Sequence, residues 1–177
     1  MLGFIIRNTV DFKNIEAIKY LYYALVRSKL EFGSVIWSPH YEIHINMIEK
    51  VQKKFVRYLF FKKFNFYTYL VPYIQSLDIF DICKLSVRRK VASLIYLYKL
   101  LKGVIDDSSI LSKISFYEPA FNSRSSALFK VPRYRTVHRA SSPLYRMMTL
   151  FNSVSSELDI FNINSTAFRV KCYQLLN

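Results

Sequence analysis

The sequence predicts a mainly α-helical bundle, with a small β-hairpin or loop element in the C-terminal half. Hydrophobic residues make up 52% and aromatic residues 17% of the 177 positions, and only 3 Gly and 5 Pro are present. So much apolar surface can offset the entropy lost on ordering, which excludes a disordered tail or a linker. Apolar residues recur at steps of three and four over long stretches, which is typical of helices with one buried face.

Two long helices are predicted in the first third of the chain. In residues 14–31 the apolar positions follow helical spacing, whereas residues 32–37 indicate a turn or a short extended link. Ser38 and Pro39 then have the residue types of an N-cap and a first helical position. Helical spacing continues without a break, which predicts a helix of about six turns through residues 41–61.

The middle of the chain is predicted as a connector followed by a third helix. Residues 60–72 are rich in Phe and Tyr and end at a proline, so we expect a packed connector. The helix is expected over residues 78–101, with Gly103 placed for a left-handed C-cap. Asp106 and Asp107 follow in a turn that leads into a helix start, so we interpret them as capping residues rather than as a magnesium site.

Beyond this point the predicted elements are shorter. The β-tolerant runs 114–117 and 128–131 predict a small hairpin or a pair of loops around residues 122–126. A Ser-Pro pair opens a helix expected over residues 142–154, and a last helix is expected over residues 165–176.

The charge of the chain is strongly unbalanced. It carries 26 Lys and Arg against 12 Asp and Glu, for a formal net charge of +14. A protein this basic meets polyanions, either nucleic acid or an anionic membrane surface. The acids are placed so that residues 50–77, 82–105 and 119–156 each contain six cations and no carboxylate.

The first basic stretch lies on the predicted helix 41–61, whose geometry sorts its side chains. At about 100° per residue, four cations fall within one sector and the apolar residues lie opposite. The cations are Lys50, Lys53, Lys54 and Arg57, and the apolar residues are Tyr41, Ile45, Ile48, Phe55 and Leu59. We interpret the stripe as a contact to a nucleic-acid backbone. A solvated helix face and an anionic lipid surface are the alternatives.

The other two basic stretches add further candidate nucleic-acid ligands. These are Arg88 and Arg89 in the second stretch, and Arg133, Arg135, Arg139 and Arg146 in the third. In residues 131–139, expected to be irregular, arginines alternate with Tyr134, whose ring offers a face for base stacking. The alternative is a loop whose arginines cap helix ends or pair with acids elsewhere.

No catalytic or metal site is recognisable in the remaining residues. His40 and His44 flank Glu42 in an order other than that of the zinc proteases. Cys83 and Cys172 stand alone, so neither a disulfide framework nor a thiolate zinc site is expected. Because a Gly-rich phosphate loop and a nucleophile elbow are also lacking, we expect no cofactor, no metal and no enzymatic activity of this chain alone.

The apolar runs are too short to predict a membrane segment. No window reaches 18 consecutive apolar residues, and the run at the N-terminus is too short for a signal peptide. We therefore expect no membrane partner and an intracellular location, nuclear or cytoplasmic.

Four patches, in order along the chain, resemble the part that follows the polymerase core in reverse transcriptases of jockey-like non-LTR retrotransposons. They are LVRSKLEFGSVIWSP from residue 25, IxxIExVQKKF from residue 45, LFxVPxxRT from residue 128 and SPLxRM from residue 142. The similarity covers about residues 3–152. It implies a thumb-like helical segment with a basic helix over residues 1–75. A C-terminal extension over residues 76–177 would pack with it as one unit.

The resemblance implies a position in a larger enzyme rather than an activity. In that family of RNA-directed DNA polymerases, the aromatic-x-Asp-Asp motif and the endonuclease lie upstream of this part. The string ending in Asp106 and Asp107 lacks the aromatic residue, so we assign it no metal role. The expected function is therefore a non-catalytic fragment that grips RNA, DNA or an RNA–DNA hybrid. The alternative is an interaction module or non-functional remnant that self-associates, or packs on a polymerase core, through the aromatic connector.

Overall fold

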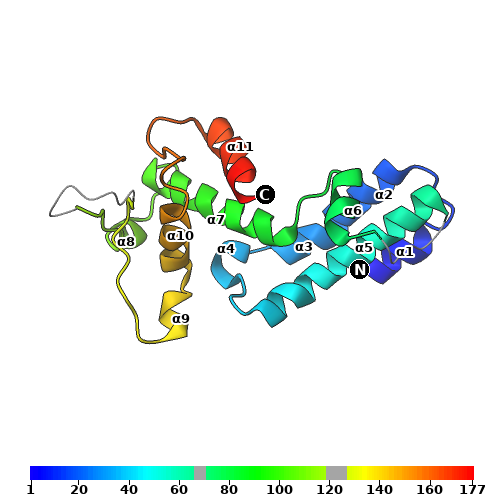
Figure 1. Ribbon diagram of the computed structural model, residues 1–177, viewed down its shortest axis with the longest axis horizontal. Helices are drawn as coiled ribbons and strands as arrows, with labels where there is room; N and C mark the ends of the chain where they lie inside the picture. The colour runs from blue at the N-terminus through cyan, green and yellow to red at the C-terminus, as the bar shows by residue number, and fades with distance from the viewer. Residues whose placement is uncertain (66–70, 119–126) are drawn as a thin grey trace. The chain divides into compact units, whose positions relative to one another are not determined.

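The computed structural model describes residues 1–65, 71–118 and 127–177 (Figure 1). These residues are mainly helical, which confirms the predicted fold class. The chain divides into two compact units. Unit 1 comprises Met1–Gly33 and Pro39–Ser86, and unit 2 comprises Ser34–Ser38 and Val87–Asn177. The last change of unit therefore comes after Ser86, later in the chain than the division expected after residue 75.

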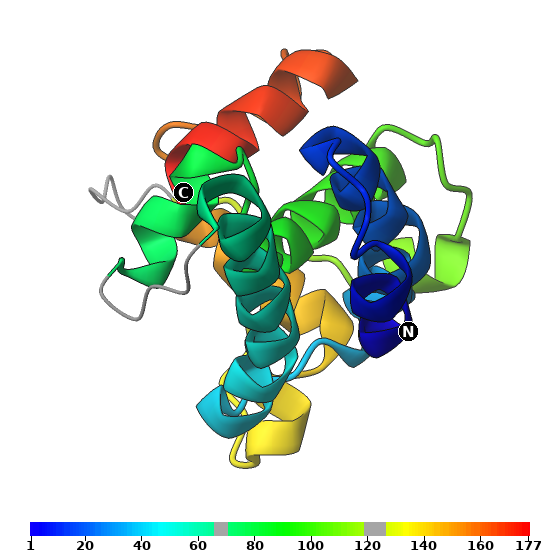
Figure 2. The same ribbon diagram turned by 90° about the vertical axis from the view of Figure 1, so that its right-hand side faces the viewer.

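Unit 1 is built around one long helix, α5, which contacts three others. Its elements are α1 (Leu2–Asn8), α2 (Ile15–Tyr22), the π-helical turn η1 (Tyr23–Arg27), α3 (Ser28–Glu31), α5 (Glu42–Phe64) and α6 (Tyr73–Ile79). In Figure 2, α5 has α1 and α2 on one side and α6 on the other, and all three pack against it.

Unit 2 is built from shorter helices around most of α7 (Leu85–Leu101), whose first two residues belong to unit 1. Its other elements are α4 (Ser34–Trp37), α8 (Ser108–Leu111), α9 (Val137–Ala140), α10 (Pro143–Asn152) and α11 (Ser165–Leu176). The predicted helices over residues 142–154 and 165–176 are confirmed, with Pro143 in the first turn of α10.

The first predicted helix is confirmed as an unbroken helical run with a π-helical turn in its middle. Asn14 caps it, because its side-chain oxygen accepts hydrogen bonds from the backbone N–H groups of Glu16 and Ala17 at 2.9 and 3.3 Å. The run ends before Gly33, whose φ of +63° is readily adopted by glycine.

The predicted start of the long helix is wrong. Residues 34–37 form the short helix α4 rather than an extended link, and α5 begins at Glu42. Ser38 is not an N-cap, because its N–H donates to the carbonyl of Ser34 at 3.1 Å and so closes the end of α4. Ser38 therefore forms the C-terminal end of α4 instead of the helix start that the Ser-Pro pair predicted.

The helix predicted over residues 78–101 begins later, at Leu85, and a separate helix, α6, precedes it. The break lies at Asp81, whose φ of +52° is outside the helical region. The N–H of Ile82 closes this turn onto the carbonyl of Leu77 at 3.0 Å. The C-terminus of α7 is as predicted: Gly103 has a φ of +68°, and the N–H of Val104 reaches back to the carbonyl of Lys99.

In the described residues, the predicted hairpin is represented by one antiparallel bridge, between Phe116 and Phe129. Asn152 of α10 fastens it, since its side chain accepts from the N–H groups of Leu128 and Phe129 and donates to the carbonyl of Phe129 at 2.8 Å. The loop predicted at residues 122–126, and residues 66–70 of the predicted connector, lie outside the described residues.

The core of unit 1 contains a polar network beside its apolar side chains. The rings of Tyr22 and Phe55 stack with centroids 3.9 Å apart. Gln52, fully buried on α5, accepts from the Tyr22 hydroxyl at 3.1 Å and donates to the Tyr73 hydroxyl at 3.1 Å and to the Cys83 carbonyl at 3.0 Å. One amide therefore joins α2, α5, α6 and the segment before α7.

Replacing Gln52 with alanine is expected to lower the free energy of unfolding by about 2–4 kcal/mol, because the buried hydroxyl of Tyr22 and the half-buried hydroxyl of Tyr73 and carbonyl of Cys83 each lose a hydrogen bond. Urea unfolding followed by circular dichroism measures this change. Gln75→Ala is the matched control, since Gln75 is exposed on α6, and it should change the stability by less than about 0.5 kcal/mol. Equal effects of the two substitutions would contradict a structural role for the buried amide.

Candidate nucleic-acid interface

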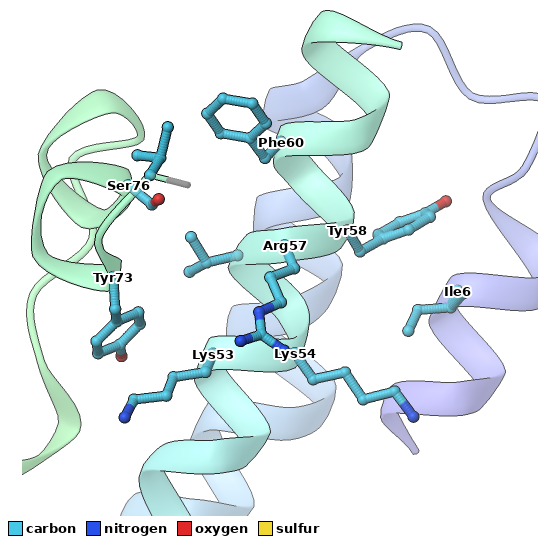
Figure 3. Close-up of a pocket in the computed structure, with 10 residues that line it drawn as sticks. Ile6, Lys53, Lys54, Arg57, Tyr58, Phe60, Tyr73 and Ser76 are labelled. Carbon is cyan, nitrogen blue, oxygen red and sulfur yellow. The ribbon is translucent and has the colours of Figure 1, made fainter. Parts of the chain in front are cut away.

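A trough of about 300 Å³ runs over the basic face of α5, between α1 and α6 (Figure 3). Its lining residues come from all three helices and from the segment just before α6. They are Ile6, Lys53, Lys54, Val56, Arg57, Tyr58, Phe60, Val71, Tyr73 and Ser76. The trough therefore combines three of the four cations of the predicted stripe with apolar and aromatic side chains.

The predicted sorting of α5 into two faces is found in its second half. Lys50, Lys54 and Arg57 are exposed and Lys53 is half-buried, whereas Phe55 and Leu59 are fully buried. The sorting fails at the start of the helix, where Tyr41 is exposed rather than in the core.

The hydroxyl groups of the trough donate hydrogen bonds within unit 1. Tyr58 donates to the carbonyl of Thr9 at 3.1 Å, and Ser76 donates to the carbonyl of Pro72 at 3.3 Å. Tyr73 donates to a carboxylate oxygen of Glu49 at 2.6 Å. Burial, followed by this bond to Glu49, raises the pKa of Tyr73 well above its usual range, so its hydroxyl stays protonated.

Negative charge is turned away from the trough. No carboxylate is present among its described lining residues. Glu49, which directly precedes the stripe on α5, is buried, and the oxygen that binds Tyr73 also accepts from the N–H of Leu85 at 3.4 Å. The ammonium group of Lys53 lies 5.1 Å from the centroid of the Tyr73 ring, which favours the cation electrostatically.

Three of the predicted nucleic-acid ligands in unit 2 are buried in the protein or bound to other groups of it. Arg89, predicted as a nucleic-acid ligand, is only 3% exposed, so almost none of its side chain is at the surface. It lies one helical turn from both Leu85 and Ser93, which are buried on the inward face of α7. Arg88 donates to the hydroxyl of Tyr173 at 3.3 Å.

Arg146 binds three backbone carbonyl groups of unit 2. Its guanidinium donates to Val35 at 2.6 Å and to Ser38 and Ser141 at 3.3 Å each. Burial lowers the pKa of this guanidinium. Arg146 therefore ties α10 to the end of α4, which is a structural use of its charge.

The remaining predicted ligands are at the surface of unit 2. Arg133, Arg135 and Arg139 are exposed, and the last of these lies in α9 rather than in irregular chain. Tyr134 is half-buried, with its ring 4.7 Å from that of Tyr145 in an edge-to-face arrangement. The guanidinium carbon of Arg139 is 5.4 Å from the Tyr134 ring centroid, so two side chains of the protein already contact the predicted stacking ring.

The acidic, histidine and cysteine side chains do not gather into a metal site in the described residues. In the described part of the chain, no group of three or more His, Cys, Asp or Glu side chains could hold a metal ion. Asp107 is the N-cap of α8, as predicted, and accepts from the hydroxyl of Ser109 and the N–H of Ile110. The Ser109 bond is the main cause of the lowered pKa of this carboxyl.

Comparisons with known proteins identify no relative. No family model, no curated protein and no solved structure matches the chain. The resemblance to reverse transcriptases therefore stays a prediction from the sequence patches. No described helix is both long and apolar enough to cross a membrane.

The sequence did not predict the buried polar residues of α5 or the residues outside α5 that line the trough. Glu49, Gln52, Val56 and Leu59 share one helical stripe, so two polar residues at core positions were the available signal for the buried network. No pattern in the sequence predicts that Ile6 and Val71 line the trough, because only tertiary packing brings them to α5.

Cys172 is expected to resist thiol reagents in the folded protein. Burial raises its pKa to about 12, so at pH 8 only about one thiol in ten thousand is ionised, and a rise to pH 9 increases this only about tenfold. Maleimide labelling of a Cys83→Ser variant, followed by mass spectrometry, should show little reaction in buffer and rapid reaction in denaturant. Labelling in buffer at the rate of a small-molecule thiol would contradict this burial.

Proposed function

We propose that the chain is a non-catalytic helical module that binds the phosphate backbone of RNA or DNA through the trough of unit 1. The observation that carries the proposal is that Lys53, Lys54 and Arg57 meet in one concave site, with no carboxylate among its described lining residues. Together with the sequence patches, it supports the role of a thumb and tail of a retrotransposon RNA-directed DNA polymerase.

The arrangement favours backbone contact over a merely solvated helix face. A solvated face usually mixes both signs of charge, whereas here the nearest acid on the helix, Glu49, is bound inward. Contacts to phosphate carry no sequence information directly, so binding should be similar for unrelated sequences. Three phosphate contacts would give a slope of about −2 to −3 for log affinity against log salt.

Reversing two charges of the trough tests the proposal. Lys53→Glu with Lys54→Glu should weaken binding of an RNA–DNA hybrid by about 10- to 100-fold at 100 mM salt and flatten the salt slope. Fluorescence anisotropy over a salt series, with two unrelated sequences, measures both effects.

The matched control reverses Lys13 and Lys29, which are exposed in unit 1 outside the trough. Both double variants lower the net charge by four, from +14 to +10. Equal loss of affinity in the two variants would show that total charge, and not the trough, binds the nucleic acid.

A second candidate function is self-association through apolar surface. The exposed fractions of Phe32, Ile43 and Met47 in unit 1 are 82%, 73% and 58%. Ile43 and Met47 lie one helical turn apart on α5, so they form one exposed apolar patch. In the predicted aromatic connector, Phe60 is buried and Phe64 is 40% exposed, and residues 66–70 lie outside the described residues.

Self-association should appear as a rise in weight-average mass with protein concentration. Light scattering between about 1 and 100 µM measures it, and Ile43→Lys with Met47→Lys should restore the monomer mass by placing charge on the apolar surface. A constant monomer mass over this range would leave nucleic-acid binding as the single candidate.

A further inference from the structure

We infer that a cavity of unit 2 binds one nucleotide, with its phosphate on Lys99 and Lys102 and its base on the ring of Phe161. The cavity has a volume of about 530 Å³ and is lined by the C-terminal end of α7, the segment after it, the start of α11 and the segment before that helix. Its lining residues are Tyr98, Lys99, Lys102, Val104, Phe161, Asn162, Ile163, Asn164 and Ser165. None of these residues lines the trough of unit 1, so the inference goes beyond the proposed function.

The two lysines give the cavity a cationic side. They are three positions apart at the end of α7, where the N–H of Lys102 still donates to the carbonyl of Tyr98, so they lie on the same side of the helix. Lys99 is exposed, and Lys102 donates to the carbonyl of Phe161 at 2.5 Å. Because an ammonium group has three N–H donors, Lys102 can bind a phosphate oxygen as well. No carboxylate is present among the described lining residues to compete with a phosphate.

The apolar side of the cavity is accessible from solvent. The exposed fractions of Val104 and Phe161 are 68% and 48%. The ring of Phe116 packs beside that of Phe161, with centroids 6.2 Å apart. Asp159 holds the turn, because its carboxylate accepts from the N–H groups of Phe161 and Asn162 at 2.8 and 3.3 Å. An accessible aromatic ring beside cations is the combination that stacks a base and binds its phosphate.

Hydrogen-bonding groups also line the cavity and favour a nucleotide over an acidic peptide. Asn162, Asn164 and Ser165 are exposed among the lining residues. The side-chain oxygen of Asn164 accepts from the N–H of Ala167 at 2.8 Å, and its NH₂ group remains a donor. The edge of a base uses such groups, whereas the carboxylates of a peptide need only the two lysines. The volume of about 530 Å³ lies within the usual range of small-molecule sites.

Three ligands test the inference on the unmodified protein. They are adenosine 5′-monophosphate, ribose 5-phosphate, which lacks the base, and adenosine, which lacks the phosphate. Equilibrium dialysis measures the three affinities, and the nucleotide should bind at least about 10-fold more tightly than either part. Equal binding of ribose 5-phosphate would overturn the role of the aromatic ring, and equal binding of adenosine would overturn that of the lysines.

Substitutions on the two sides of the cavity locate the site. Phe161→Ala should weaken binding of the nucleotide by about 5- to 100-fold and leave that of ribose 5-phosphate unchanged, whereas Lys99→Glu should weaken both. Phe12→Ala and Lys130→Glu are the matched controls, because Phe12 is 43% exposed in unit 1, Lys130 is exposed in unit 2, and neither lines the cavity. With native circular dichroism for all variants, an unchanged affinity in Phe161→Ala, or an equal loss in Phe12→Ala, would overturn the inference.

A single-stranded pentamer of deoxyadenylate distinguishes a free nucleotide from one within a strand. If the site takes a nucleotide of a strand, Phe161→Ala also weakens binding of the pentamer; a loss confined to the mononucleotide assigns the site to free nucleotides. The variant with Lys53→Glu and Lys54→Glu separates this cavity from the trough, since it should leave the affinity for adenosine 5′-monophosphate unchanged. An equal loss in that variant would place the phosphate in the trough and overturn the inference, while leaving the proposed function standing.

Discussion

The buried amide of Gln52 is the interaction on which the rest of unit 1 depends. Its three hydrogen bonds reach Tyr22 on α2, Tyr73 at the start of α6 and the Cys83 carbonyl before α7. Apolar packing alone tolerates small shifts of one helix along another, but a buried amide has few positions in which all its partners are satisfied. The amide therefore fixes the register of the helices around α5.

This register also prepares the candidate site. Tyr73 belongs both to the buried network and to the lining of the trough, so the network holds the wall formed by α6. Glu49 accepts from Tyr73 and Leu85 on the inward side, while the cations of the next two turns line the outward side. One helix therefore has two different faces: Glu49 is buried with one carboxylate oxygen hydrogen-bonded, whereas Lys54 and Arg57 are exposed.

Local pattern in the sequence predicts the fold where periodicity and capping agree, as in α11 and at the Gly103 stop of α7. It fails where a distant group decides the outcome. Ser38 belongs to the end of α4, whose carbonyl groups bind Arg146. The local pattern fails also at Asp81, where a local turn with a positive φ, an uncommon conformation for aspartate, interrupts the predicted helix. The same limit applies to the site, since the stripe on α5 follows from spacing, but Val71 joins it only through the tertiary fold.

The path of the chain between the units has a consequence for synthesis on the ribosome. The short segment Ser34–Ser38 belongs to unit 2, although the chain on both sides of it belongs to unit 1. The carbonyl groups of Val35 and Ser38 bind Arg146, which is translated more than 100 residues later. Most of unit 1 has therefore left the ribosome before Arg146 can bind the end of α4. In a nascent chain halted after α6, the carbonyl groups of Val35 and Ser38 would be hydrated by water instead of bound to Arg146.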